Sequence, residues 1–296
     1  MKNNSFRHYQ FIALSLLGSI SAILSIFIFL PLSRTYIIDQ TRTKIQIESE
    51  LKSTQIHQWL EQGRQVAQLV STNHLVIEDI PELLNAQPEA KTETATEFRD
   101  IIAIYPNVSS ISLLNTNDGK VFFSSDATQF NRVRKNESYF QKGQKSIYVS
   151  NVIYSVSQEA PVLIISGPVQ NDIGELLAVV TIEMELRDLE KIITSNIGLG
   201  ESAEAYLVDA FGFFVTLPTE IERGILSRVV QTEGVQRATL GQSGIDTYTD
   251  YQGKSILGSY TWLPESGLIL LVEVEEAAIT GQVQQVWGWI ILGNIL

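Results

Sequence analysis

The chain has 296 residues, a formal net charge of -12 and no cysteine. This length allows two domains of ordinary size. The acidic balance argues against nucleic acid as a partner, because such binding needs a basic face that neutralises phosphates. The absence of cysteine excludes disulfides, thiolate catalysis and Cys-ligated zinc. The only histidines, His8, His57 and His74, lack metal-ligand spacing. We therefore expect neither a metal nor a cofactor.

An apolar segment without a charged residue spans positions 11–32. About 22 residues at roughly 1.5 Å of helical rise each cross a hydrocarbon core of roughly 30 Å. A cleaved signal peptide is the alternative, but the apolar stretch is longer than a typical signal core and no small-residue cleavage site follows it. The sequence thus predicts a transmembrane helix over residues 11–33.

The charges that flank this segment bear on its orientation. Lys2 and Arg7 precede it, so the positive-inside rule places residues 1–10 in the cytoplasm and the following chain outside. Arg34 and Arg42 follow on the other side and oppose that assignment.

Residues 34–76 contain no proline and a single glycine, Gly63. Apolar residues recur in this stretch at loosely helical spacing, with glutamine, lysine and glutamate between them. This pattern predicts one long amphipathic stalk helix over residues 34–76.

The next stretch changes from helix to strand signals. Residues 78–93 hold two prolines and many polar residues, which indicates a loop or a broken helix, and a short helix is predicted over 94–105. Alternating residues 108–114 predict a strand. The sequence NTNDG at 115–119 predicts a hairpin turn, with a return strand at 120–124.

An irregular, partly basic segment covers residues 126–143. Arg132, Arg134 and Lys135 come just before the pair Tyr139 and Phe140. Two interpretations stay open. The segment is either a solvated loop followed by a short helix, or a lid whose cations meet an anionic ligand in a pocket.

The stretch 148–189 organises the chain. Two apolar runs, 162–166 and 176–184, are joined by a turn that contains Gly174, which predicts an antiparallel hairpin. Spacings of three and four then predict a helix over 186–196.

A second series of strand signals follows that helix. We predict a strand at 203–209, a turn, a return strand at 213–217 and a helical connection over 221–235. Three further strands are predicted, at 245–251, 255–262 and 267–274.

The last residues, 286–296, are apolar and contain Trp287 and Trp289. Eleven residues, at roughly 1.5 Å each, are too few to span a membrane, but the tryptophans suit its interface. We interpret residues 284–296 as the start of a second transmembrane helix. An amphipathic tail is the alternative.

Four segments in this order carry a family resemblance: SYFQKG at 138–143, the strand pair at 161–192, EAYLVDAFGFFVTLP at 204–218, and the closing strands at 250–274. Over residues 34–283 the chain resembles the double Cache (dCache) family of extracytoplasmic sensor domains. The resemblance implies an α+β fold with a long N-terminal helix and two PAS-like antiparallel-sheet modules, flanked by transmembrane helices. The membrane-distal module would comprise residues 77–196 and the membrane-proximal module residues 197–283.

The resemblance also suggests a ligand site in the distal module. The amino-acid-binding branch of the family uses an arginine and an aromatic residue on the short helix, a Tyr-x-Asp on the next strand and a later aspartate. Tyr139 matches the aromatic residue, but Glu137 stands in the arginine position. Tyr154 lies near the tyrosine position with no aspartate after it, and Glu183 stands at the last aspartate. The predicted ligand-binding residues are Tyr139, Tyr154, Glu183, Arg134, Phe140 and Tyr148.

The role of Glu183 has two interpretations. A partly desolvated carboxylate pairs strongly with a cationic amine, which favours a ligand contact. A carboxylate that faces solvent near the end of a strand is the alternative.

No nucleophile–base set, phosphate loop or metalloprotease motif is present, so we do not expect an enzyme in these residues. The resemblance implies the small-molecule-sensing input region of a bacterial receptor of histidine kinase, nucleotide cyclase or chemoreceptor type. It would be anchored in the inner (plasma) membrane, with its main domain periplasmic, and would form a homodimer through the long helix. A membrane-tethered envelope interaction module without signal output is the alternative.

Overall fold

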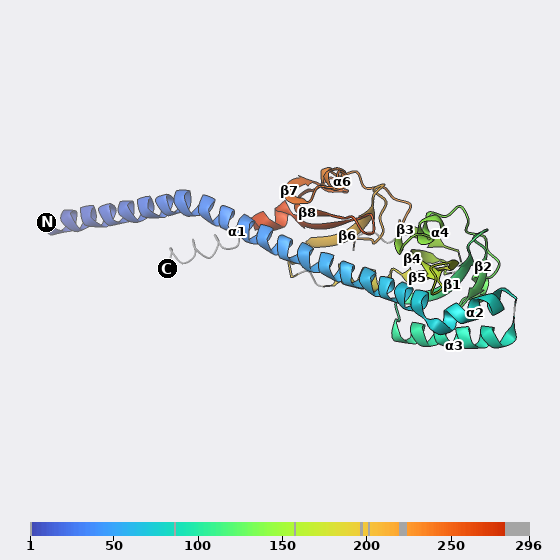
Figure 1. Ribbon diagram of the computed structural model, residues 1–296. Helices are drawn as coiled ribbons and strands as arrows, with labels where there is room; N and C mark the ends of the chain where they lie inside the picture. Colours follow the sequence, from blue (N-terminus) through green and yellow to red (C-terminus); the bar gives the residue numbers. More distant parts are fainter. Residues whose placement is uncertain are drawn as a thin grey trace.

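The computed structural model describes residues 2–85, 87–156, 158–195, 198–200, 202–218 and 224–281, and for residues 2–30 it describes the backbone only. One helix, α1 (Lys2–Thr72), runs along both β-sheets of the described chain (Figure 1). The predicted α+β architecture, with a long N-terminal helix and two antiparallel sheets, is confirmed.

The predicted membrane segments fall largely outside what the structure describes. Nothing is described of the side chains of residues 11–30 or of residues 284–296. Within the described part of the chain, no helix combines the length and the apolar character that crossing a membrane requires.

The long helix ends four residues before the predicted end of the stalk. Asn73 separates it from α2 (His74–Leu84), and its side-chain oxygen accepts hydrogen bonds from Leu75 N and Val76 N at 3.0 and 3.3 Å. Asparagine is a preferred helix N-cap because its side chain satisfies the free amides of the first turn. Helix α3 (Pro88–Ile104) follows, with its proline in the first turn, where a missing N–H costs nothing.

The sheet within residues 108–185, which we call the distal sheet after the predicted membrane-distal module, contains five strands in the order β2-β1-β5-β4-β3. The predicted hairpin forms its centre, with β4 (Ala160–Gln170) paired to β5 (Leu176–Glu185). Strand β1 (Val108–Asn115) pairs with the other edge of β5 and also with β2 (Val121–Ser124). Strand β3 (Tyr148–Ser155), which the sequence did not predict, pairs with β4.

The two faces of this sheet have different covers. On β5, Val180, Ile182 and Met184 belong to the core that packs against α1. The alternate residues face the other way, toward η1 (Ala127–Gln129) and α4 (Ser138–Gly143). Close packing of α1 on the sheet requires glycine at position 63, because a Cβ there would collide with Met184 Sδ.

Helix α5 (Arg187–Thr194) leads from the distal to the proximal sheet. The proximal sheet contains β6 (Ala203–Asp209), β7 (Gly244–Thr249), β8 (Ser255–Leu263) and β9 (Leu268–Glu275) in the order β6-β9-β8-β7. The predicted strands at 203–209, 245–251, 255–262 and 267–274 are therefore confirmed, with ends that shift by one or two residues.

Two predictions for the connection between β6 and β7 are wrong in part. Instead of a strand, residues 213–217 form isolated bridges, Phe214 with Val208 and Phe213 with Val229. The helix starts late, as α6 (Glu233–Thr239), because the Thr232 hydroxyl caps it by accepting from Val235 N at 3.3 Å. Residues 219–223 lie outside the described part.

Lys52 joins α1 to the helix between the modules. Its side chain has no exposed area. Its ammonium donates to the carbonyl of Ile192 at 2.7 Å and to Ser195 Oγ at 3.2 Å, and it pairs with Glu48 at 3.4 Å. A cation at the C-terminal end of a helix meets the negative end of the helix dipole. The contact therefore fixes α5 against the long helix.

Candidate functional site

The distal site is built on the face of the sheet that points away from α1. Glu183 on β5 lies opposite Ser110 on β1 and Ile164 on β4. The strand period of two places it on the same face as Thr181 and Val179. Glu183 is only 7% exposed. Of the two interpretations of Glu183, the one in which it faces solvent near a strand end is therefore wrong, because Gln129 and Ser155 cover the carboxylate.

Neutral side chains contact both oxygens of this carboxylate. Gln129 Nε2 donates to Glu183 Oε1 at 3.2 Å, and Ser155 Oγ donates to Oε2 at 3.4 Å. Arg134 Nη2 donates to Gln129 Oε1 at 2.9 Å. The amide of Gln129 therefore links a cation to a buried carboxylate.

Burial and the charge of Arg134 have opposite effects on the pKa values of Glu183 and Tyr139. Burial raises the pKa of Glu183, and the positive charge of Arg134 opposes that rise. Burial also raises the pKa of Tyr139 to about 12, again against Arg134. Tyr139 consequently stays a neutral phenol at physiological pH.

Helix α4 is held firmly on the sheet. Ser166 Oγ donates to the carbonyl of Tyr139 at 2.7 Å. A Cβ on Gly143 would lie 2.5 Å from that same Ser166 Oγ, so glycine permits the close approach. Tyr139 and Phe140 are both buried, in a cluster with Leu114 and Val179 among others.

The structure brings three of the six predicted site residues together, since the charges of Arg134 and Glu183 act on Tyr139. Phe140 packs in the same apolar cluster as Tyr139. Tyr148 lies beside this cluster, where Lys142 Nζ donates to its hydroxyl at 3.3 Å and sits 4.4 Å from the ring centroid. Tyr154 does not belong to the site around Glu183, since its side chain is 59% exposed. Successive strand residues point to opposite faces, so it is the next residue, Ser155, that reaches Glu183.

Sequence reasoning missed Gln129 and Ser155. Gln129 comes from the irregular segment, where Asp126 caps the short turn by accepting from Thr128 N at 2.9 Å. The pattern D-x-T suggests that local cap. It does not reveal that the next side chain turns inward. Gln129 is 3% exposed and covers the sheet, whereas most other residues of 126–137 are exposed, so the segment is a largely solvated loop with one side chain turned inward.

The proximal sheet carries an equivalent carboxylate. Glu273 on β9 lies opposite Glu204 on β6 and Gly258 on β8, and it is 3% exposed. The hydroxyl of Tyr206 donates to it at 3.0 Å and that of Tyr248 at 2.8 Å. Burial raises the pKa of Glu273 to about 7, and the two tyrosine hydrogen bonds oppose the rise.

A small cavity of about 30 Å³ adjoins Glu273, with Glu204, Asp250 and Lys254 also in its lining. This volume accommodates water rather than an organic ligand. In the part of the chain that is described, no group of three or more His, Asp or Glu side chains is arranged to hold a metal ion.

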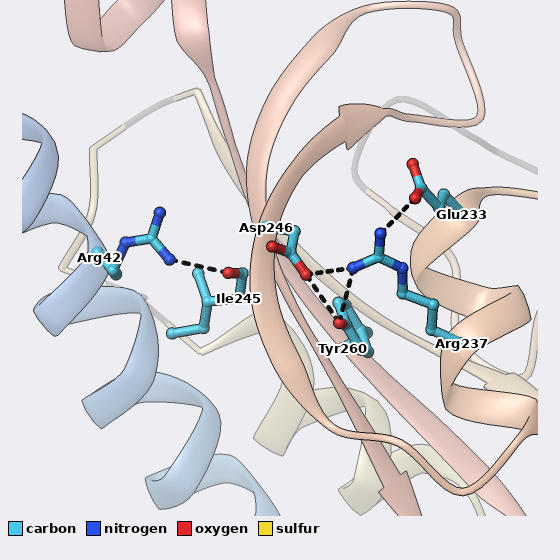
Figure 2. Close-up of polar contacts among 6 residues, drawn as sticks. All are labelled: Arg42, Glu233, Arg237, Ile245, Asp246 and Tyr260. Atoms are coloured by element: carbon cyan, nitrogen blue, oxygen red, sulfur yellow. Dashed lines mark hydrogen bonds and ion pairs between the residues drawn. The ribbon is translucent and has the colours of Figure 1, made fainter.

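The edge strand of the proximal sheet is held from two sides (Figure 2). From α1, Arg42 Nη1 donates to the carbonyl of Ile245 at 2.8 Å. From α6, Arg237 pairs with Asp246 at 2.5 Å, and the Tyr260 hydroxyl donates to the same carboxylate at 2.8 Å. Strand β7 is thereby fixed between the two helices.

Both sheets thus repeat one plan, in which strands β1, β5, β4 and β3 of the distal sheet correspond in order to β6, β9, β8 and β7 of the proximal sheet. The family model for the double Cache domain (dCache_1) matches residues 32–283. The chain belongs to the double Cache domain family. No curated protein sequence matches it significantly.

Solved structures show the same fold at low sequence identity. The ligand-binding domain of Mlp24 with asparagine is 16% identical, with a TM-score of 0.58 over 85% of this chain and 98% of that one. The sensor domain of the V. cholerae histidine kinase DctB is 14% identical, with a TM-score of 0.59 over 82% and 99%. The sensory domain of the Campylobacter jejuni chemoreceptor Tlp3 with isoleucine bound is 14% identical, with a TM-score of 0.60 over 84% and 98%.

Proposed function

We propose that this chain is the extracytoplasmic input region of a bacterial transmembrane receptor, and that its distal module binds a small molecule with an amino group at Glu183. The role is one of binding rather than catalysis. The receptor would be of histidine kinase, nucleotide cyclase or chemoreceptor type, anchored in the inner membrane. Family membership and the sensor domains among the similar structures support this proposal.

The observation that carries the proposal is the environment of Glu183. A carboxylate removed from water costs free energy unless a cation or strong donors compensate it. The partners that contact its two oxygens, Gln129 and Ser155, are neutral, at 3.2 and 3.4 Å. An incoming ammonium group would form a shorter, charge-assisted hydrogen bond. Arg134 stands near enough to receive a carboxylate on the same ligand, which favours amino acids within the class of amines.

Entry of such a ligand requires the cover to move. Gln129, Tyr139 and Glu183 are each less than 9% exposed. We propose that residues 126–137 open, and that they close again on the ligand. A ligand shifts this equilibrium only by its differential affinity for the open and closed states.

The route to the membrane side would follow elements that touch both modules. Helix α1 packs on both sheets, and Lys52 ties it to α5 between them. Strand β9 continues directly into the helical residues 276–281 at the end of the described chain. A change in the distal cover is therefore positioned to alter how α1 and the end of β9 sit together.

We propose a homodimer through α1. Tyr36, Ile47 and Leu69 are 62%, 60% and 42% exposed, although they are large and apolar. They follow one another by 11 and then 22 residues, and a repeat of about 11 residues returns to nearly the same side of a helix. Ile47→Glu should lower the sedimentation coefficient of the full chain, and an unchanged value would contradict dimerisation through this face.

A thermal-shift screen tests the binding function. The full chain would be placed in phosphatidylcholine nanodiscs with amino acids, amines, carboxylates, purines and sugars. A ligand at about 100 times its Kd stabilises the folded state by about 2.7 kcal/mol. We expect a shift with an amine or amino acid that Glu183→Gln abolishes. The matched control, Glu273→Gln in the other module, should retain it. No shift from any compound, or a shift that survives Glu183→Gln, would contradict the proposal.

A further inference from the structure

A groove of about 580 Å³ lies where the long helix, the link from α3 to β1 and the inter-module helix α5 meet. Its lining includes Gln55, Gln58, Trp59 and Gln62 from α1, and Tyr105 and Asn107 from the link between α3 and β1. Gln58 follows Ile47 by 11 residues, so the groove borders the proposed dimer face of α1. The groove does not include Glu183 or Tyr139. Its volume is within the usual range for small-molecule sites.

Two polar atoms on successive turns of α1 lack partners in the described part of the chain. Trp59 Nε1 is a buried donor, and Gln55 Oε1 is a buried acceptor. Trp59 is 4% exposed. Residues four apart lie on the same face of a helix, so the side chains that carry this donor and this acceptor share one face of α1. Buried polar groups are nearly always hydrogen-bonded, and an unsatisfied one costs about 1–3 kcal/mol.

The chemistry of this pair favours a hydroxyl group. A hydroxyl is both a donor and an acceptor, so one such group can donate to Gln55 Oε1 and accept from Trp59 Nε1. An ammonium group would satisfy only the acceptor, and a carboxylate would satisfy only the donor.

The remainder of the lining favours a neutral ligand. Gln58, Gln62 and Asn107 contribute amides, which are neutral and offer both donors and acceptors. Asp188 and Lys191 on α5 bring opposite charges, and their side chains already pair with each other at 2.7 Å. Tyr105, which is half-buried, adds an apolar surface with a polar tip.

We propose that this groove binds a neutral polyhydroxylated small molecule, a sugar, with one ring hydroxyl between Gln55 Oε1 and Trp59 Nε1. Both atoms are covered in the present conformation, so side chains around them rearrange on binding and the environment of the indole changes. The ligand would touch α1, the link between α3 and β1, and α5 together. It would therefore add a second input at the junction of the modules, separate from the amine site.

The test is calorimetric titration of the full chain in phosphatidylcholine nanodiscs, which avoid detergents with sugar headgroups. The probes are glucose, N-acetylglucosamine and maltose, with tryptophan emission recorded in parallel. We expect at least one probe to bind and to change the emission. Gln55→Leu should weaken that binding roughly tenfold or more, where each factor of ten is about 1.4 kcal/mol.

Matched variants separate this site from its surroundings. Gln65→Leu removes an exposed amide of α1 that does not line the groove, and it should leave sugar affinity unchanged. Glu183→Gln should also leave it unchanged, so failure of the amine site and failure of this site are distinguishable. Trp59→Phe removes the indole N–H but keeps an aromatic ring, and it replaces Gln55→Leu if that variant does not fold.

Three results would overturn the inference. One is the absence of binding by any probe up to roughly 10 mM, beyond the millimolar range of weak sites. In that case water satisfies the two atoms. Another is equal weakening by Gln55→Leu and Gln65→Leu. The last is binding that Glu183→Gln abolishes, because the sugar would then occupy the distal site.

Discussion

Each of the two modules has a carboxylate at the same position of its sheet, but the side chains that surround the two carboxylates differ. Glu183 and Glu273 each stand two residues before the end of their strands, β5 and β9, and each faces away from α1. Gln129 at the end of η1 and Ser155 at the end of β3 donate to Glu183 at 3.2 and 3.4 Å. Two tyrosines from strands of the sheet itself seal Glu273. One backbone plan thus supports either a carboxylate that is covered partly from outside the sheet, by Gln129, or one that is enclosed by side chains of the sheet itself.

A single position on the neighbouring strand explains part of this difference. Ile164 on β4 lies opposite Glu183, whereas Gly258 on β8 lies opposite Glu273. A Cβ on Gly258 would lie 2.8 Å from the Tyr248 hydroxyl and 2.9 Å from Glu273 Cγ. Glycine therefore leaves the space that the phenol of Tyr248 fills. The distal sheet has an isoleucine side chain there, and its carboxylate is contacted by Gln129 of η1 and Ser155 of β3 instead of by tyrosines.

The largest effect is expected at the sealed carboxylate. Burial raises the pKa of Glu273 from 4.5 to about 7. Because the folded-state pKa is above the unfolded one, the stability from the protonated form is fully present below about pH 4.5 and is lost as the pH rises through about 7. At 1.36 kcal/mol per pKa unit, the Glu273→Gln variant should have a free energy of unfolding at neutral pH that is higher than that of the wild type by up to about 3 kcal/mol.

The measurement is the free energy of unfolding in urea, from about pH 5 to about pH 8. The wild-type curve should fall across this window, and the curve of the Glu273→Gln variant should be flatter and higher at neutral pH. Parallel curves for the two proteins would show that Glu273 does not titrate as a buried group.

The joint between the modules should give the next effect. Lys52→Met keeps the volume of the side chain but removes the ammonium from the carbonyl of Ile192 and from Ser195. Hydrogen bonds from a charged donor contribute about 1.5–3 kcal/mol, so we expect a loss of about 2 kcal/mol. Lys44→Met, at an exposed position of the same helix, is the control for thermal unfolding. Equal losses in both variants would argue against a joint at Lys52.

A smaller effect is expected at the outer edge of the proximal sheet. Tyr260→Phe removes the hydroxyl that donates to Asp246 at 2.8 Å and accepts from Arg237 at 3.3 Å (Figure 2). Asp246 is partly exposed, so water replaces part of the lost contact and the loss should be about 0.5–1 kcal/mol. Tyr154→Phe, an exposed tyrosine in the distal module, serves as the reference in the same chemical denaturation series. A Tyr260→Phe variant as stable as Tyr154→Phe would mean that this network does not fix β7.

The smallest change in stability is expected at the distal carboxylate. Burial raises the pKa of Glu183, so its ionised form also weakens the folded state at neutral pH. Glu183→Gln should raise the melting temperature slightly, by less than Glu273→Gln does, while it abolishes the ligand-induced shift. A marked fall in melting temperature without ligand would instead make Glu183 a structural group.

The contrast between these carboxylates was not visible in the sequence. The resemblance singled out Glu183, and the strand pattern predicted β9, but nothing distinguished Glu273 from any other charged strand residue. Its burial depends on Tyr206 and Tyr248, which are 67 and 25 residues away along the chain. Contacts over such distances follow from the order and register of strands, and local patterns do not encode these.

Local chemistry was sufficient wherever a signal was short-range. The alternation of residues and the turns at 115–119 and at Gly174 determined the hairpins β1–β2 and β4–β5 and the α+β class, because strand period and turn geometry depend on neighbouring residues. The order of four motifs determined the family. The tertiary structure alone decided that Ser155 rather than Tyr154 reaches Glu183, that Gln129 turns inward, and that Lys52 caps α5. Each of these depends on which face of one element meets another, and that is fixed only when the sheets pack on the long helix.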